Sequence, residues 1–225
     1  MSRTVVVTAV AAERDAVAQG IGAPEPVALG PYAATRCGDV LVVAGGVGPA
    51  AAAAAAAYAV ATEDVGLLVS MGVAGAFASA RLAHGDVAIA TSIVAADLGA
   101  MSPERFLDLT ALGLDGGAVV DCPTGLVTDA RDRIAAAGLH VAVGPVLTLS
   151  TMTGTTERAA ELMGMHGAIA EAMEGAGVAH VATLHGLPVV EVRAISNEVG
   201  LRDRDAWDLP AALASLGTAA GAMLP

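Results

Sequence analysis

Acidic residues occur at two places in the sequence where their side chains could take part in catalysis. Glu13 follows an apolar, β-branched run near the start of the chain, and Glu171 and Glu174 lie three residues apart in an apolar segment further on. Carboxylates bind water and sugar hydroxyls, and they act as general bases. We expect Glu171 to be a solvated acid in the first turn of a helix, where the helix dipole favours it. Glu174, between a methionine and a glycine, fits either that position or a buried functional role.

A second charged set lies in the last apolar run of the chain. Glu191 and Arg193 are two residues apart, so their side chains share one face of a strand. Charges on a buried strand are costly unless they are paired. The two residues could form a mutual structural ion pair, or Arg193 could organise an acid in a crevice, with Glu13 as the candidate. Ser196 and Asn197 follow directly at the end of this run.

These residues have to be positioned by alternating strands and helices. Apolar, β-branched runs predict strands at residues 4–8, 40–44, 66–71, 86–94, 145–149 and 188–195. Alanine-rich stretches predict helices at residues 12–19, 50–62, 156–165, 168–185 and 209–223. Such alternation indicates an α/β domain with a parallel or mixed sheet, and we expect one domain over residues 1–225. Residues 95–126 are the least regular stretch and predict a long excursion from the sheet.

Small or polar residues follow five of the predicted strands. They are Glu13 and the segments 45–48, 72–75, 150–154 and 196–197. Because ligands of α/β sheets bind outside the carboxyl ends of the strands, this clustering predicts a small-molecule site at one edge. Gly175 and Gly177 lie inside a predicted helix, where each costs about 1 kcal/mol relative to alanine. They therefore predict a close approach to this backbone.

Composition excludes several classes of function. All 11 basic residues are arginine, against 23 acidic ones, and the formal net charge is −12. Without lysine there is no Schiff-base or P-loop lysine, and no polybasic surface for nucleic acid or anionic lipid is expected. Cys37, Cys122 and five scattered histidines show no metal-ligand spacing, which predicts reduced thiols in a cytoplasmic protein without a metal. The uncharged residues 40–61 contain glycines and a proline, so we expect strand, turn and helix there rather than a membrane span.

A dinucleotide-binding fold is the main alternative from local motifs. Residues 46–51 read Gly-Val-Gly-Pro-Ala-Ala and fit the loose pattern G-x-G-x-x-A between a strand and a helix. The motif follows the second strand, however, and the acid expected at the end of the next strand is missing, because Glu63 and Asp64 precede that strand. We therefore expect no cofactor.

Several segments, in consistent order along the chain, carry a resemblance to a known family. They are Ala9-Val10-Ala11-Ala12-Glu13, the glycine turn at 45–48, Gly72-Val73-Ala74-Gly75 with Gly85-Asp86-Val87, Met173-Glu174-Gly175, and Val192-Arg193-Ala194-Ile195-Ser196-Asn197. The chain resembles the nucleoside phosphorylase and nucleosidase superfamily, and within it most closely the futalosine hydrolases. The resemblance implies a three-layer α/β/α sandwich with a mixed central sheet, and hydrolysis of the N-ribosidic bond of futalosine with release of hypoxanthine.

The resemblance also implies a role for individual positions. Glu13 would hold and activate the attacking water, helped by Arg193. Glu174 would accept hydrogen bonds from ribose hydroxyls while Met173 packs against the sugar, and Asn197 would contact the purine. The other implied positions line the base or the sugar: Thr151, Met152, Val73, Ala74 and Gly75.

Two positions depart from the pattern of related enzymes. Adenine-specific nucleosidases have an aspartate where this chain has Asn197. A carboxamide can donate to the O6 oxygen of an oxopurine and accept from N7–H, whereas a mismatched edge would leave a buried polar group unpaired at about 1–3 kcal/mol. Asn197 therefore favours hypoxanthine or guanine over adenine. Val73 replaces a serine that contacts phosphate in many phosphorylases, which favours water as the nucleophile. Arg14 and Arg36 stay open as alternative phosphate ligands.

Other functions remain open on the sequence. A purine nucleoside phosphorylase, a methylthioadenosine or aminofutalosine nucleosidase, and a non-catalytic nucleoside-binding module would share much of this pattern. The expected partner is a small-molecule nucleoside, not nucleic acid or a membrane, and the resemblance implies a homo-oligomer, with a dimer favoured. Futalosine carries a carboxylate on the 5′ side of its sugar, for which Arg105 and Arg202 are candidates; either could instead be a surface residue paired with a neighbouring acid.

Overall fold

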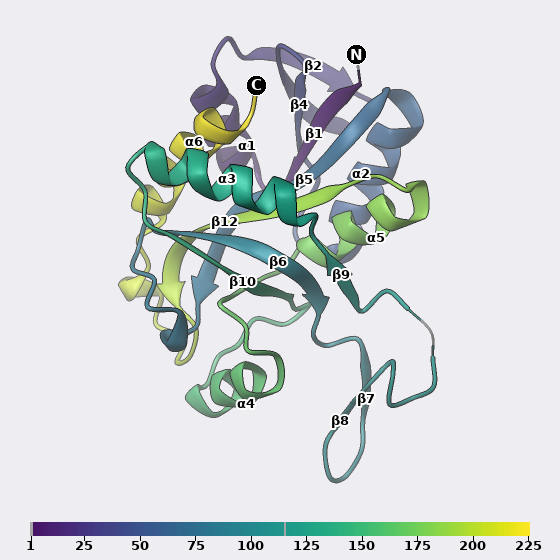
Figure 1. Ribbon diagram of the computed structural model, residues 1–225, viewed down its shortest axis with the longest axis vertical. Coiled ribbons are helices and arrows are strands. Elements are labelled where there is room, and N and C mark those ends of the chain that lie inside the picture. Colours follow the sequence, from purple (N-terminus) through teal and green to yellow (C-terminus); the bar gives the residue numbers. More distant parts are fainter. Residues whose placement is uncertain (1, 115) are drawn as a thin grey trace.

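A mixed β-sheet with helices on both faces forms the structure, which is a computed structural model that describes residues 2–114 and 116–225 (Figure 1). The strands are β1 (Arg3–Thr8), β2 (Glu25–Leu29), β3 (Tyr32–Cys37), β4 (Val40–Ala44), β5 (Val65–Ala76), β6 (Val87–Ala95), β7 (Gly99–Met101), β8 (Phe106–Asp108), β9 (Val119–Asp121), β10 (Val141–Thr148), β11 (Ala170–Ala172) and β12 (Val189–Glu198). The helices are α1 (Ala11–Ile21), α2 (Pro49–Thr62), α3 (Thr124–Ala136), α4 (Thr156–His166), α5 (Gly175–His185) and α6 (Leu209–Met223).

Five of the described helices lie in two layers. On one side of the sheet α6 packs against both α1 and α3, and on the other side α2 packs against α5, whereas α4 lies apart from both groups (Figure 1). The core between the layers consists of β-branched residues from the strands and alanines from the helices, such as Val5, Val42, Ala55 and Ala219, all without exposed surface. Small side chains let helices and sheet approach closely. The predicted three-layer α/β/α sandwich with a mixed sheet is confirmed.

The sheet is partly closed on itself. Its order is β11-β10-β6-β12-β5-β1-β4-β3-β2, and β11 also pairs with β5. Strands β5, β12, β6, β10 and β11 therefore form a ring. Strand β12 is parallel to β5 and antiparallel to β6, whereas β11 is parallel to β10 and antiparallel to β5. This closure brings segments that are distant in sequence to the carboxyl ends of β1, β5 and β12.

One predicted element is wrong in part. The helix expected over residues 168–185 is strand β11 followed by helix α5, with Met173 and Glu174 between them. Residues 170–172 form a strand because they pair with both β10 and β5, and this tertiary pairing overrides the helical preference of an alanine-rich run. The remainder of the predicted helix survives as α5.

Several elements were not predicted. Helix α3, the hairpin β2–β3 and the short strand β9 lie where no element was expected, and strands β5 and β12 extend further than predicted. The irregular stretch 95–126 includes the β7–β8 hairpin, which stands away from the rest of the molecule in Figure 1. Residues 40–44 and 49–62 form β4 and α2, as expected. No helix in the described part of the chain combines the length and apolarity needed to cross a bilayer.

Candidate active site

A cavity of about 250 Å³ opens where the carboxyl ends of β1, β5 and β12 meet. Its lining comes from segments spread over almost the whole chain, as predicted from the residues that follow the strands. The lining residues are Ala9, Val10, Glu13, Val47, Val73, Ala74, Gly75, Met152, Glu171, Ala172, Met173, Glu174, Ser196, Asn197 and Trp207.

Glu13 lies in the first turn of α1 and is almost completely buried, with 4% of its surface exposed. One carboxylate oxygen accepts hydrogen bonds from the backbone N–H groups of Ala9 and Val10 at 2.9 and 3.1 Å, and the other accepts from the N–H of Val73 at 2.9 Å. Burial raises the pKa of Glu13, while the hydrogen bond from Val73 and the charge of Arg193 lower it in part. The side chain is thus held in one orientation in the cavity with a raised proton affinity, as a general base requires.

Arg193 is fully buried on β12 and has a partner for each of its three guanidinium nitrogens. Its Nε donates to Glu191 at 2.8 Å, its Nη1 to Glu174 at 3.2 Å and its Nη2 to the hydroxyl of Ser70 at 2.8 Å. The mutual ion pair with Glu191, one of the two interpretations from the sequence, is therefore present. Arg193 also organises an acid in the cavity, but among the described ion pairs that acid is Glu174 rather than Glu13.

Arg193 and Glu13 nevertheless approach the same point beside Gly72 on β5. A Cβ atom at Gly72 would lie 2.6 Å from Nη1 of Arg193 and 2.7 Å from Oε1 of Glu13, closer than real Cβ atoms come to other atoms. Glycine is therefore required at this position for the two charged groups to approach each other. At this short range the positive charge of Arg193 lowers the pKa of Glu13, although burial raises it overall.

Glu174 lies directly before α5 and is buried, so of the two positions that the sequence left open it takes the buried one, not the solvated one. Its Oε1 accepts from the backbone N–H of Gly48 at 3.2 Å, in the glycine turn after β4. The close approach predicted from the helix glycines is also confirmed, because a Cβ at Gly175 would collide with the carboxylate of Glu191. Three carboxylates, those of Glu13, Glu174 and Glu191, thus surround a single guanidinium. Such an excess of negative charge stabilises a cationic centre in the cavity.

Asn197 lies near the end of β12 and lines the same cavity as Glu13. Its side-chain oxygen accepts from the hydroxyl of Ser196 at 2.9 Å, and its amide nitrogen donates to the carbonyl of Glu198 at 2.9 Å. These contacts orient the carboxamide and leave one N–H and one oxygen lone pair for a ligand. The carboxylate and the carboxamide that the sequence singled out therefore open onto one cavity.

Glu171 does not lie where the sequence predicted. It is not a solvated helix acid but a residue of strand β11 with 6% of its surface exposed, and it lines the cavity. Its two carboxylate oxygens accept from the backbone N–H of Thr153 at 2.9 Å and from the Thr153 hydroxyl at 2.5 Å. The expectation is wrong because β11 is only three residues long, too short for a recognisable strand pattern.

The segment predicted to bind the base, Thr151 and Met152, lies only in part at the cavity. Met152 lines the cavity as expected, but Thr151 is exposed and is not among the lining residues; the nearby Thr153 instead contacts Glu171.

Trp207 also lines the cavity and was not predicted. The guanidinium of Arg202 lies 5.4 Å from the centre of the Trp207 ring, which is a cation–π contact. Arg105 is exposed in the β7–β8 hairpin and is not among the lining residues of this cavity.

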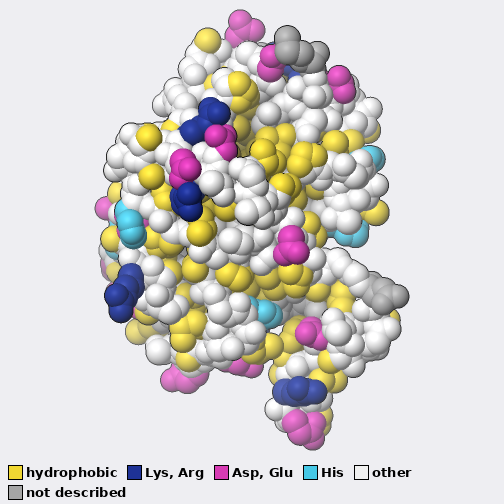
Figure 2. All heavy atoms as spheres, in the orientation of Figure 1, with side chains coloured by type: hydrophobic (Ala, Val, Ile, Leu, Met, Phe, Trp, Pro, Cys, Tyr) yellow, Lys and Arg dark blue, Asp and Glu magenta, His cyan; other side chains and the backbone are white. Residues whose placement is uncertain are grey.

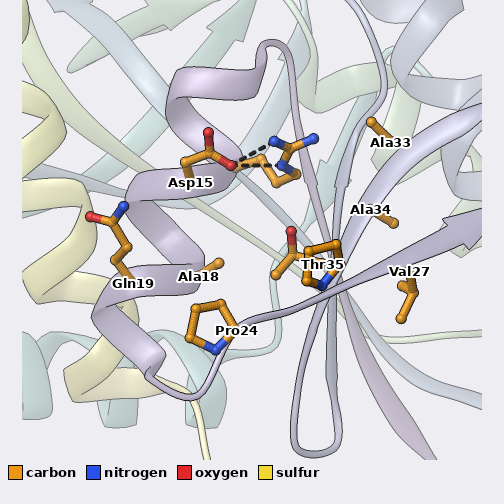
Figure 3. A pocket seen from close by; sticks show the side chains of 10 residues that line it. Asp15, Ala18, Gln19, Pro24, Val27, Ala33, Ala34 and Thr35 are labelled. Atoms are coloured by element: carbon orange, nitrogen blue, oxygen red, sulfur yellow. Dashed lines mark hydrogen bonds and ion pairs between the residues drawn. The ribbon is translucent and has the colours of Figure 1, made fainter.

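A second cavity, of about 340 Å³, lies between α1 and the β2–β3 hairpin (Figure 3). Its charged groups are Arg14 and Asp15, which pair with each other at 2.6 Å and leave Asp15 half exposed. Small apolar side chains such as Ala18, Val27 and Ala34 make up much of the rest of its lining (Figure 3). Because its charges neutralise each other near the surface, this cavity is a poorer candidate for catalysis than the one with buried, unequal charges.

Metal chemistry has little support in the described part of the chain. No group of three or more histidine, cysteine, aspartate or glutamate side chains there could hold a metal ion. Both cysteines are free and buried, and burial raises the pKa of the Cys122 thiol to about 12. A thiol with such a pKa stays protonated and is a poor metal ligand and nucleophile. The polar groups that the structure brings to the site are carboxylates, an amide and backbone groups, with one guanidinium behind them.

Comparison with known proteins shows similarity to a protein family and to individual proteins over nearly the full length of this chain. The model of the phosphorylase superfamily matches residues 3–224. A futalosine hydrolase of Acidothermus cellulolyticus is 44% identical over 225 residues, covering 98% of this chain and 90% of that protein. A futalosine hydrolase of Streptomyces coelicolor is 44% identical over 228 residues, covering 98% and 94%. The solved 5′-methylthioadenosine/S-adenosylhomocysteine nucleosidase of Neisseria meningitidis, in complex with methylthio-immucillin-A, shares the fold with a TM-score of 0.86 at 21% identity, covering 99% and 98%.

Proposed function

The chain belongs to the phosphorylase superfamily and, within it, to the futalosine hydrolases, and on this premise we propose that it hydrolyses the N-ribosidic bond of futalosine. The products are hypoxanthine and dehypoxanthine futalosine. The observation that carries the proposal is that Glu13, Glu174 and Asn197 line a single cavity, with Arg193 bound to Glu174. The phosphorylase and the methylthioadenosine or aminofutalosine nucleosidase are not favoured, because both relatives at 44% identity are futalosine hydrolases.

The proposed reaction is dissociative. The glycosidic bond lengthens, the ribose becomes oxocarbenium-like, and a water held by Glu13 attacks the anomeric carbon while Glu13 takes its proton. Glu174 accepts hydrogen bonds from the ribose hydroxyls, with Met173 against the sugar and Val73, Ala74 and Gly75 beside it. Because carboxylates outnumber guanidinium groups in this cluster, the positive charge that develops on the sugar is stabilised.

Departure of the base is assisted at the other end of the cavity. As the glycosidic bond breaks, its electron pair goes to the purine, which takes up a proton from solvent water at N7. Asn197 donates to O6 and accepts from this N7–H, using the N–H and lone pair that its contacts with Glu198 and Ser196 leave free. The proton that Glu13 takes from the attacking water is released to solvent, so one water molecule is added across the bond overall. Met152 contributes to the base-binding surface. Thr151 is assigned to this surface by the resemblance, although its side chain is exposed in the structure.

Water, not phosphate, is the proposed nucleophile. Phosphate sites are built from free guanidinium groups and hydroxyl or backbone donors. Arg193 is completely buried, already donates to Glu191, Glu174 and Ser70, and is not among the residues that line the cavity, so it is poorly placed to bind phosphate. Val73, the residue in the place of the phosphate-contacting serine, offers an apolar side chain, and its backbone N–H is bound to Glu13.

The wider setting is also part of the proposal. We place the enzyme in the futalosine route to menaquinone, in the cytoplasm, as one domain over residues 1–225 that assembles as a homodimer. The proposed substrate is the nucleoside alone. On the face shown in Figure 2, arginine side chains are scattered among acidic ones and do not gather into a patch that would attract nucleic acid.

Product analysis tests the function directly. The purified protein is incubated separately with futalosine, aminofutalosine, inosine and methylthioadenosine, with and without inorganic phosphate, and the products are separated by chromatography. We expect rapid release of hypoxanthine from futalosine, at a rate that phosphate does not change. Release that depends on phosphate, with formation of a sugar phosphate, would assign the protein to the phosphorylases. Binding of futalosine without release of base would identify a non-catalytic module.

A further inference from the structure

Glu171 is a buried acid that the proposed mechanism does not use. It lines the same cavity as Glu13 and Asn197, and both of its carboxylate oxygens are held by Thr153. A carboxylate is removed from water only at considerable cost unless specific partners compensate for it. The two hydrogen bonds from Thr153 compensate in part, and they fix the direction of the carboxylate. A fixed, buried acceptor at the edge of a ligand cavity calls for a donor on the ligand.

The strand register places Glu171 opposite Asn197. Gly75 on β5 is the register partner of Glu171 on β11 and also of Asn197 on β12. Residues in register on neighbouring strands point to the same face of a sheet, so both side chains stand on one face with Gly75 between them. Two strand spacings separate their backbones by roughly 10 Å. The two side chains project from these backbones into the one cavity that both of them line.

Gly75 keeps the space between the two side chains open. A Cβ atom at this position would lie 3.0 Å from the amide nitrogen of Asn197 and 2.9 Å from the side chain of Val199. Any other residue would therefore fill the gap or displace Asn197. The result is a floor of bare backbone bounded by a carboxylate on one side and a carboxamide on the other.

The hydrogen-bonding pattern of an oxopurine matches these two boundaries. In hypoxanthine, O6 and N7 together form one hydrogen-bonding edge of the purine. N1, on the other side of C6, carries a hydrogen. In adenine, the exocyclic group is a donor and N1 is a bare acceptor. A carboxylate is an acceptor only, and each of its oxygens can accept a second hydrogen bond besides the one from Thr153. Opposite adenine N1, the same carboxylate would face a lone pair.

We propose that Glu171 is a specificity-determining residue that accepts a hydrogen bond from N1–H of a 6-oxopurine, while Asn197 binds the O6 and N7 side. The proposal rests on the proposed function, since it places the leaving base of that reaction between these two side chains. Thr153 is the positioning residue that holds the carboxylate. A site that hydrogen-bonds one edge of a base rejects an analogue that lacks the partner, because the buried group of the protein is left unpaired.

The electrostatic surroundings of Glu171 are consistent with an acceptor role. Burial raises the pKa of Glu171, whereas the two hydrogen bonds from Thr153 and the charge of Arg158 act in the opposite direction and favour the ionised form. Arg158 lies in the first turn of α4, whose N-cap is Thr155, two residues beyond Thr153. The same short segment therefore orients the carboxylate and supplies a cation that favours its ionisation.

The first experiment measures base binding and does not depend on turnover. Affinities of hypoxanthine and 1-methylhypoxanthine are determined by calorimetry for the wild type and for Glu171→Ala. We expect the wild type to bind hypoxanthine at least about tenfold more tightly than the variant does, while the affinity for the methylated base, which has no N1–H, does not fall in the variant. Equal binding of hypoxanthine by both proteins would overturn the proposal, because steric exclusion of the methyl group would then explain any preference.

The second experiment measures selectivity during turnover. Glu171→Gln places an amide donor opposite N1, so the ratio of kcat/KM for futalosine to that for aminofutalosine should fall by about tenfold or more. Glu157→Gln, which removes an exposed carboxylate in the first turn of α4, is the matched control and should leave the ratio unchanged. An unchanged ratio in Glu171→Gln contradicts the proposal.

The two hypotheses fail in different ways. If the wild type does not release hypoxanthine from futalosine, the proposed function is wrong, whatever the variants do. If the wild type does so and the Glu171 variants keep both base affinity and selectivity, only the assignment of Glu171 is wrong. Should the variants fail to fold, the wild type can still overturn the proposal: binding 1-methylhypoxanthine as tightly as hypoxanthine would show that N1–H has no acceptor in the site.

Discussion

The carboxylate of Glu13 shows how one side chain is prepared for catalysis. Three backbone N–H groups orient it, burial raises its pKa, and the nearby guanidinium of Arg193 keeps it from being neutralised too readily. Backbone N–H groups, which have no side-chain rotamers of their own, therefore fix the direction of this carboxylate. The amide of Asn197 is oriented by the hydroxyl of Ser196 and the carbonyl of Glu198.

Replacing Glu13 tests the proposed base. Glu13→Gln keeps the size of the side chain but removes its ability to take a proton from water, so kcat for futalosine hydrolysis should fall by about a hundredfold to ten-thousandfold. The measurement is hypoxanthine release under saturating futalosine. Asp15→Asn, two residues further along α1 and outside the cavity, is the control and should remain active. Near-normal turnover in Glu13→Gln would reject the assignment.

Replacing Asn197 tests how the base is recognised. Asn197→Asp removes the amide donor to O6 and places a carboxylate there, which accepts from the amino group of adenine instead. We expect the preference for futalosine over aminofutalosine to fall by about tenfold or more, as measured by the ratio of the two kcat/KM values. Glu198→Gln, at the exposed neighbouring position, controls for the change of charge at the strand end. Unchanged selectivity would remove Asn197 from base recognition.

At the scale of elements, the site depends on how closely α5 approaches the glycine turn before α2. Glu174 directly precedes the first residue of α5, and its carboxylate accepts a hydrogen bond from the backbone of Gly48. Further along α5, Gly177 lies against the carbonyl of Pro49. A shift of either helix would move Glu174 away from the cavity. The alanine-rich sequences of both helices make this close packing possible.

The contact between α2 and α5 can be tested with one methyl group. A Cβ atom at Gly177 would lie 2.0 Å from the carbonyl oxygen of Pro49, which is backbone and has little room to move. Gly177→Ala should therefore lower the free energy of unfolding by about 1–3 kcal/mol despite the better helix propensity of alanine. Urea denaturation measures the change. The control is Gly164→Ala in α4, where a Cβ meets no atom of the described structure within 4 Å; this variant should be as stable as the wild type or slightly more so.

At the scale of the whole molecule, the structure accommodates several buried acids with raised proton affinity. Burial is the largest cause of the raised pKa of Glu13, Glu171 and Glu191 alike. These residues come from three segments, and the closed ring of β5, β12, β6, β10 and β11 together with α1 brings Glu13 and Glu171 to the same cavity, while Glu191 is buried beside Arg193. The fold thus bears the energetic cost of keeping carboxylates away from water around the cavity.

The raised pKa of these buried carboxyl groups predicts how the free energy of unfolding changes with pH. A carboxyl with a raised pKa in the folded state binds its proton more tightly there than in the unfolded chain, so its stabilising contribution is complete below the unfolded pKa. That contribution is lost as the pH rises through the raised pKa. The free energy of unfolding of the wild type, relative to that of Glu13→Gln, should therefore decrease from acidic to neutral pH. Urea titrations of both proteins over this range measure it; a difference that stays constant would show that Glu13 has an ordinary pKa.

The amino-acid sequence by itself determined the α/β class, the strand ends at which the site lies, and Glu13, Glu174, Arg193 and Asn197 as its candidate groups. Those inferences rest on local patterns: β-branched runs, alanine-rich stretches, and small or polar residues after strands. Helix glycines also indicated the close packing at Gly175 and Gly177, which the structure confirms.

Only the tertiary structure decided which of these groups meet. Arg193 binds Glu174 and Glu191, Glu171 becomes a strand residue facing the cavity, and Trp207 joins the lining. Each of these outcomes depends on the pairing of strands far apart in the chain, above all on β11, which pairs with both β10 and β5. A strand of three residues has no periodicity of its own, because long-range pairing rather than local preference stabilises it.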